Sequence, residues 1–385
     1  MPRLMICLLS LVLLPNLAWS AEPVVTLEQS PASVKVLIGE DVFTVFHYGA
    51  DRRKPFFLPV TGPGGFELLQ KGVAEEKAGS IGRKVVVASE SVVLKTPTGN
   101  GATVQYGDIL EIGSLSGNQL QLAGKQEWIS RSDIAPLAAV VVRLINDDPS
   151  PSKDRVTGDK YDHPHHKGIW FSVDEINEHR HWMEGSLVRT QSVELKKSGT
   201  SAAELHFVNH WLDKKEQPLL IETTTVTITS DRLLIYDTVL APAEDQVHIG
   251  DTKEGMLAIR LMGTMREMAG GGPVINSNGL KTSAKGWGKT AAWVNYDGPI
   301  DGHVFGVTLM DARENPWPSR YHVRDYGLFA VNPFGAGAYT AGTADVQPKH
   351  DRTLKQGETL HFKFGVWIHG PNVTIDQIQQ VYNRL

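Results

Sequence analysis

A histidine-rich stretch, residues 162–182, carries the side chains best suited to chemistry. Its sequence, DHPHHKGIWFSVDEINEHRHW, holds five of the fourteen histidines in the chain, two tryptophans and several carboxylates. Histidine has an ordinary pKa near neutrality, so it can transfer a proton, bind a metal or hold an anion. The stretch is therefore the first candidate for a catalytic or binding site.

The chain around the first three histidines is predicted to be extended, because a residue that precedes a proline avoids the helical region. Alternate side chains of an extended chain share a face, so His163 and His165 are expected together, with His166 on the opposite side. Gly168 permits a tight turn before residues 169–171, whose apolar character predicts a buried strand. A loop with several titratable groups is thus expected beside an aromatic strand.

Three further segments place polar groups between apolar strands. The first, residues 250–255, carries two carboxylates and an amine. In the second, residues 321–326, strand alternation places His322 and Arg324 on one face. The third is His303, which follows an Asp-Gly turn. Each segment would supply a wall of the site if the fold brings it to the histidine stretch.

We interpret these groups as an acid–base site for a sugar. Histidine would transfer protons near neutral pH, a carboxylate would be its counterpart, and cationic side chains would hold a substrate oxygen or a developing negative charge. The reaction would be a hydrolysis, an elimination or an epimerisation. The predicted catalytic residues are His165, His166, Glu254 and His322, and the predicted substrate-binding residues are His163, Lys167, Trp170, Asp251, Arg324, Asp325 and Asn332.

A metal-dependent site is the alternative. Its ligands would be His163, His165 and a third group from His322, Glu254 or His303. Three protein ligands with an open position are typical of catalytic zinc or iron, and a cupin-like barrel would be the natural host. The cupin motif requires a glutamate a few residues after His165, whereas the first one here, Glu175, lies too far along. We therefore favour a site without a cofactor and keep a divalent metal as the alternative.

Several of these residues also have a purely structural interpretation. His179 and His181 are expected in loops or on the surface. Trp170, Trp182 and Trp293 fit the core of a sandwich, where large aromatic residues dominate the packing. Histidines in strand patterns are expected to be hydrogen-bonded structural residues: His206, His210, His361 and His369. The cluster 163–167 resists this interpretation, because like charges in one loop weaken folding unless a ligand or carboxylate offsets them.

The composition and the first twenty residues indicate which kinds of partner the protein binds and in which cellular compartment it is expected. The net charge is −5 and no basic stripe is present, which disfavours nucleic acid and anionic membranes and favours a sugar or glycan. Residues 1–20 have one early charge, an apolar run and small residues before Ala21, so we predict a cleaved signal peptide and a periplasmic or secreted protein. Cys7, the only cysteine, lies inside that signal. No later stretch has the length and apolarity to span a bilayer.

The remaining pattern is that of strands. Long segments with alternating apolar residues, from 187 to 261 and again from 292 to 368, predict an antiparallel β-sandwich of the large galactose-mutarotase-like type. Residues 81–140 differ, with very short strands and dense turn signals that are typical of an SH3-like barrel. We predict sandwich segments at 21–80 and 141–385, with 81–140 as an inserted module. Thr374 and Gln377 predict a capping box and one C-terminal helix.

Several blocks of the chain resemble an exported bacterial protein family catalogued as "methane oxygenase PmoA", a domain of unknown function. The blocks are HYGADRRKP (47–55), PVTGP (59–63), DHPHHKGIW (162–170), DTKEG (251–255) and HVRDYGLF to NPFG (322–335). The label names a membrane-embedded copper enzyme, so we carry no oxygenase activity over. Members usually pass from the second block to the third by a short connection, and here the SH3-like segment intervenes.

The function predicted from the sequence is that of a periplasmic or secreted carbohydrate-active enzyme with a histidine-rich acid–base site. A non-catalytic protein that binds glycans in the envelope is the rival, for which the SH3-like module is the supporting feature. The two hypotheses differ in turnover, since only the first requires a proton donor and acceptor at a bound sugar.

Overall fold

The computed structural model describes residues 23–69, 84–87, 89, 91–105, 108–116, 119–136, 163 and 165–385. Residues 1–20, the predicted signal peptide, lie outside these ranges, and so do Asp162 and the proline at 164. No helix in the described part of the chain has the length and apolarity needed to cross a membrane.

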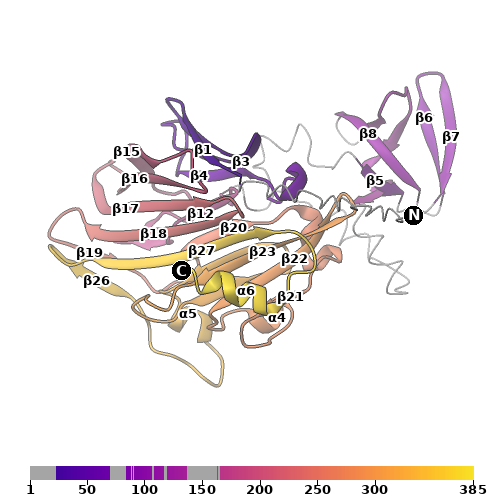
Figure 1. Ribbon diagram of the computed structural model, residues 1–385. Coiled ribbons are helices and arrows are strands. Elements are labelled where there is room, and N and C mark those ends of the chain that lie inside the picture. The colour runs from indigo at the N-terminus through magenta and orange to yellow at the C-terminus, as the bar shows by residue number, and fades with distance from the viewer. Residues whose placement is uncertain are drawn as a thin grey trace, which may run out of the picture.

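Two eight-stranded antiparallel sheets make up most of the described protein (Figure 1). The first sheet has the order β1 (Val25–Gln29), β2 (Ser33–Ile38), β3 (Asp41–His47), β4 (Phe56–Val60), β12 (Ile169–Phe171), β20 (Leu257–Arg260), β25 (Leu328–Asn332), β24 (Arg320–Val323). The second has the order β15 (Val188–Lys197), β16 (Ala202–Leu212), β17 (Pro218–Thr229), β18 (Leu233–Pro242), β27 (Leu360–His369), β23 (His303–Asp311), β22 (Trp293–Ile300), β21 (Val274–Asn276).

The inner faces of the two sheets share one hydrophobic core. Phe46 of the first sheet stacks on Phe207 of the second with ring centroids 4.6 Å apart, and Tyr296 of the second contacts Phe329 of the first at 6.0 Å. Aromatic pairs of this kind bury large apolar areas and hold sheets face to face. The predicted all-β fold, a large antiparallel sandwich, is confirmed.

The long strands follow the predicted alternation, because one face of the second sheet is buried and the other meets solvent. In β16 and β17 buried and partly exposed residues alternate along nearly the whole strand. The strands between residues 187 and 261 do not all belong to the second sheet, however. β19 (Gln246–Ile249) joins a four-stranded sheet with β13 (Glu175–Ile176), β14 (His179–Arg180) and β26 (Arg352–Lys355), and β20 crosses to the first sheet. All four residues of β20 are buried, as a central strand requires.

Residues 84–136 form a third, seven-stranded sheet with a hydrophobic core of its own, in which Val85, Leu94, Leu120 and Ile129 are buried. Its order is β11 (Ile134–Pro136), β5 (Lys84–Val87), β8 (Ile109–Ser116), β9 (Gln119–Leu122), β10 (Trp128–Ser130), β6 (Ser91–Thr96), β7 (Gly99–Gln105). The turn between β6 and β7 is complete at Thr98, so β7 begins at Gly99.

Short helices complete the fold: α4 (Ser283–Gly286), α5 (Ala336–Thr340) and α6 (Ile375–Tyr382). The predicted capping box of α6 is present, since the Thr374 side chain accepts from the Gln377 amide and the Gln377 side chain accepts from the Thr374 amide. Helix α6 packs on the outer face of the second sheet (Figure 1), where Trp293 and Trp367 belong to the same cluster of buried residues. Its role is packing.

Gly168 fixes how the histidine stretch enters β12, and we predict that Gly168→Ala is costly. Its φ is +58°, and a Cβ there would lie 2.0 Å from the Phe57 carbonyl oxygen, so both backbone strain and a clash would result. Gly39→Ala is a matched control, because φ is +63° and the space around it is open. We expect Gly168→Ala to lower the free energy of unfolding by about 2 kcal/mol more than the control in urea titrations. Equal losses would contradict a close approach at Gly168.

Candidate functional site

The first three histidines lie in a turn and not in an extended chain. The His166 amide donates to the His163 carbonyl over 3.0 Å, which closes a four-residue turn. The His163 and His166 rings therefore stack, with centroids 4.6 Å apart and an interplanar angle of 7°. The predicted separation of these two side chains is wrong. The physical reason is the hydrogen bond between the His166 amide and the His163 carbonyl, which turns the chain and brings the two rings to one side.

A buried lysine anchors this turn. Lys54, just before β4, is fully buried, and its ammonium donates to the carbonyls of His165 over 2.7 Å and Trp182 over 3.2 Å. It also pairs with Glu184, with 3.3 Å between Nζ and Oε1. Burial lowers the pKa of Lys54 to about 8, although Glu184 opposes this shift. One side chain thus joins both ends of the stretch 163–184.

Lys167 shares the same carboxylate. Its ammonium lies 2.8 Å from Glu184 Oε1 and 3.1 Å from Oε2. Burial alone would raise the pKa of Glu184, but the two lysines lower it overall. Lys167 was predicted to bind substrate, whereas its ammonium is committed to an internal ion pair.

His166 is buried between aromatic rings and held by an arginine. Its ring stacks on Trp170 with centroids 5.1 Å apart, and its Nδ1 lies 3.0 Å from the Arg260 guanidinium. Because a guanidinium can only donate, Nδ1 accepts and the proton of the neutral ring is on Nε2. Burial, His165 and Arg260 hold the pKa of His166 far below its usual range.

His322 brings the second polar segment to the site. It is buried in β24, and its Nδ1 donates to the Lys253 carbonyl over 3.0 Å, so the neutral ring carries its lone pair on Nε2. No residue in the described part of the chain hydrogen-bonds that Nε2. Burial and the nearby Arg324 lower the pKa of His322 to about 3. His163 also lowers this pKa, which places it close to His322.

His165 is likewise buried and neutral. Burial, with Lys54 and His163, lowers its pKa to about 4. Its ring lies edge-on to His166, with centroids 4.5 Å apart, and neither ring nitrogen has a hydrogen bond within the described ranges. His165 and His322 are therefore two neutral imidazoles with a nitrogen available to a ligand.

The segment 251–255 meets the other two, as predicted. The Asp174 amide donates to the Glu254 carbonyl over 3.1 Å, and His322 binds the neighbouring carbonyl at 253. Burial raises the pKa of Glu254, and the nearby Asp174 adds to that shift. Burial also raises the pKa of Asp174, although the ion pair with Arg180 opposes it. Burial thus raises the pKa of two carboxyl groups on the segments that adjoin the histidine stretch.

Tyr326 links the histidine stretch to the end of β24. Its ring stacks on His163 at 5.3 Å, and the guanidiniums of Arg260 and Arg324 lie 4.9 Å and 5.5 Å from its centroid. Arginine over an aromatic face is a favourable pairing. The segments 163–184, 251–255 and 322–326 therefore converge on one site.

Other predicted site residues have structural roles. Trp170 is fully buried beneath His166, so it offers no face to a sugar. The Asp251 carboxylate accepts from the amides of Gly337, Ala338 and His350, which ties α5 and a loop to the site. Asn332 is buried and donates to the Thr252 carbonyl over 2.8 Å. All three residues were predicted to bind substrate. In the structure Trp170 packs beneath His166, and Asp251 and Asn332 hold neighbouring backbone in place.

Three further histidines differ in their positions. His181 lies in the turn after β14, as the loop alternative predicts, but it is buried and its Nε2 lies 2.9 Å from the Leu212 carbonyl, so the surface alternative is wrong for it. His179 is partly exposed in β14. His303 is exposed at the start of β23, where its ring contacts Phe66 and Phe305 and none of the site residues. Asp325 is exposed at the end of β24, on the rim of the site.

The metal alternative finds no assembled ligand set. Within the described ranges, no group of three or more His, Cys, Asp or Glu side chains is arranged to hold a metal ion. The predicted ligands are used otherwise, because His163 stacks on His166 and Tyr326, and His322 Nδ1 bonds the Lys253 carbonyl.

Three site residues escaped sequence reasoning: Lys54, Glu184 and Arg260. Arg260 left a usable signal, since a charged residue inside an apolar strand is almost never buried unless it is paired. Lys54 stands inside the block 47–55 that carries the family resemblance. Glu184 left no signal in the sequence, because only the folded chain brings it to Lys54 and Lys167.

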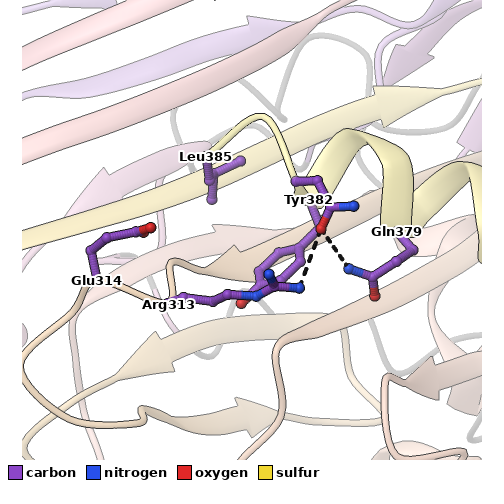
Figure 2. A pocket seen from close by; sticks show the side chains of 6 residues that line it. Arg313, Glu314, Gln379, Tyr382 and Leu385 are labelled. Carbon is purple, nitrogen blue, oxygen red and sulfur yellow. Dashed lines mark hydrogen bonds between the residues drawn. The ribbon is translucent and has the colours of Figure 1, made fainter.

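Cavities lie both away from these segments and next to His322. One, of about 350 Å³, lies between α6 and the segment after β23 (Figure 2). Its polar groups already bond one another, because Arg313 and Gln379 both donate to the side-chain oxygen Oδ1 of Asn383 and Arg313 lies over the Tyr382 ring. The other, of about 690 Å³, is lined by Arg324, Asp325 and Trp287, next to His322.

Residues 149–383 match the profile of a family described as "Family of unknown function (DUF6807)". The chain belongs to this family. The predicted membership of a family of unknown function is confirmed, whereas the methane oxygenase label and the SH3-like assignment of residues 81–140 stay predictions. No curated protein sequence matches the chain.

Two solved structures are similar to this DUF6807 protein in fold. A heparan sulfate lyase, HepC from Pedobacter heparinus, shares 10% identity over 69% of this chain and 33% of its own, with a TM-score of 0.27. A GalM/aldose epimerase homologue from C. elegans shares 7% identity over 91% of this chain and 100% of its own, with a TM-score of 0.28. The chain spans about a third of the lyase. Similarity at this level transfers no activity.

We predict that Lys54→Met destabilises the protein strongly, because it leaves two carbonyls without their donor and Glu184 with one lysine. Removing one member of a buried ion pair costs about 3 kcal/mol. Lys35→Met is the control, since Lys35 and Glu28 form an exposed pair worth less than about 1 kcal/mol. Urea unfolding measures both. A Lys54→Met variant as stable as the control would refute the anchoring role.

The buried histidines predict a pH-dependent stability. His165 and His181 have folded pKa values of about 4, below the unfolded value of about 6.5. The unfolded chain therefore binds more protons between these values, so stability is full above pH ~6.5 and falls as the pH drops toward 4. His165→Gln should reduce this fall, by roughly 1.4 kcal/mol for each pKa unit. Thermal unfolding from pH 7.5 to 4.5 measures it, and an unchanged slope would contradict the buried, neutral His165.

Proposed function

We propose that this DUF6807 protein is an exported carbohydrate-active enzyme in which buried histidines and a carboxyl group transfer protons. The observation that supports it best is the contrast between His322 and Glu254. Burial lowers the pKa of His322 to about 3, so near neutral pH its imidazole is neutral, and burial raises the pKa of Glu254 above its ordinary value. Opposed shifts of this kind are typical of the groups of an acid–base pair.

The tautomer of each histidine determines which ring nitrogen can accept a proton and which can donate a hydrogen bond. His322 is oriented by the Lys253 carbonyl, which leaves its Nε2 lone pair to accept a proton. Glu254 follows directly in the chain and supplies the acid. His165 is a second base with available nitrogens, while His166, with its proton on Nε2, is a hydrogen-bond donor. Arg324 would stabilise negative charge that develops on a substrate oxygen.

This arrangement supports reactions that move a proton at a sugar, which are epimerisation, elimination and hydrolysis. The predicted signal peptide would place the enzyme in the periplasm or outside the cell. The alternative of a glycan-binding protein draws on the third sheet, which has its own core and exposes Ile109 on its surface. Glycan binding without turnover would favour that alternative.

We expect His322→Gln and Glu254→Gln to lower kcat on an accepted glycan by about 100-fold or more, since each removes one partner of the proton transfer. The measurement is a screen of the purified protein against a glycan panel, followed by kinetics on any substrate found. His361→Gln is the control, because His361 lies on the second sheet and bonds Asp237 over 2.6 Å. Wild-type rates in both site variants would refute the acid–base role.

A further inference from the structure

The 690 Å³ cavity beside His322 has no role in the proton transfer itself. It is bounded by η4 (Glu267–Ala269), by the segment from Thr282 through α4 to Trp287, and by the turn that follows β24. Ligand pockets of about 300–1,000 Å³ enclose small molecules, so a sugar ring fits this volume. The Trp287 ring stands edge-on to His322, with centroids 6.3 Å apart, so the cavity adjoins the proposed base.

Part of the polar lining is already satisfied within the protein. The Glu267 carboxylate accepts from the Ser283 amide over 3.0 Å and from the Ser283 hydroxyl. These bonds tie η4 to α4 and leave little of either residue for a ligand. The wall is therefore fixed in shape before anything binds, which lowers the entropic cost of binding.

Arg324 and Asp325 also line the cavity. The Arg324 guanidinium lies over the Tyr326 ring at 5.5 Å, and within the described ranges neither it nor the Asp325 carboxylate makes a hydrogen bond or an ion pair. Arginine only donates and an ionised aspartate only accepts. Sugar hydroxyls do both, so the two residues together can bind adjacent hydroxyl groups.

Trp287 supplies the apolar surface. It is half-buried, and its ring is held edge-on by Tyr339 at 5.3 Å as well as by His322. An aromatic ring with polar groups around it is the usual composition of a site that orients a small ligand.

We propose that this cavity is a binding subsite for an uncharged sugar ring, packed on Trp287 and hydrogen-bonded by Arg324 and Asp325. The lining holds two carboxylates, Glu267 and Asp325, against one guanidinium. That balance disfavours a uronate or a sulfated sugar, because like charges repel in a partly buried cavity. The inference rests on the proposed function, since it places the ring beside His322.

The test measures binding separately from turnover. Titration calorimetry with methyl glycosides of neutral hexoses and with the matching uronates is run on the full-length protein and on two variants. Trp287→Ala should weaken binding of the accepted neutral glycoside about tenfold. Asp325→Asn, at an exposed position that folding does not need, should weaken it as well. His361→Gln, on the second sheet and away from the cavity, is the control and should bind as the wild type does.

The outcomes separate this subsite from the proposed function. Binding of a neutral glycoside that depends on Trp287 and Asp325, without turnover, would keep the subsite and overturn the enzyme. Turnover with no dependence on either residue would keep the enzyme and overturn the subsite. Tighter binding of uronates than of neutral glycosides, or no binding of any panel member, would also overturn it.

Discussion

The site depends on one buried ammonium. Lys54 contacts the carbonyls of His165 and Trp182 and the carboxylate of Glu184, so it joins two parts of the chain that β12 and the small strands after it would otherwise leave apart. A charge removed from water is expensive unless its partners satisfy it, and the lowered pKa of Lys54 records that cost. The position of the histidine turn follows from this interaction, because its backbone is one of the partners.

The cationic surroundings explain why the histidines are neutral. Lys54, Arg260 and Arg324 lie around the ring cluster, and each of them disfavours a further positive charge there. Glu184 is occupied by two lysines and offsets this only in part. The result is a group of imidazoles that keep their lone pairs near neutral pH, next to carboxyl groups whose pKa values burial raises. The lowered pKa values of the histidines and the raised pKa values of the carboxyl groups come from their surroundings and not from any single residue type.

Residues behind the site determine its geometry. His322 is oriented by the Lys253 carbonyl, which also accepts from Tyr339 over 2.6 Å, and Asn332 holds the preceding carbonyl. Asp251 ties the same segment to α5. These polar residues look like ligand-binding groups in the sequence, yet their work is to fix backbone that in turn fixes an imidazole. Such support decides whether a proton acceptor points at a substrate.

The sequence by itself determined the fold class, the long strands, the capped helix and the three segments that form the site. Alternation and capping are local properties, so they can be read along the chain. It also predicted that the segments that carry His165, Glu254 and His322 lie together. Only the tertiary structure decided that the histidines form a turn, that Trp170 is buried, and that Glu184 and Lys54 meet. The contacts of Lys54 join residues more than a hundred positions apart, and no local pattern encodes them.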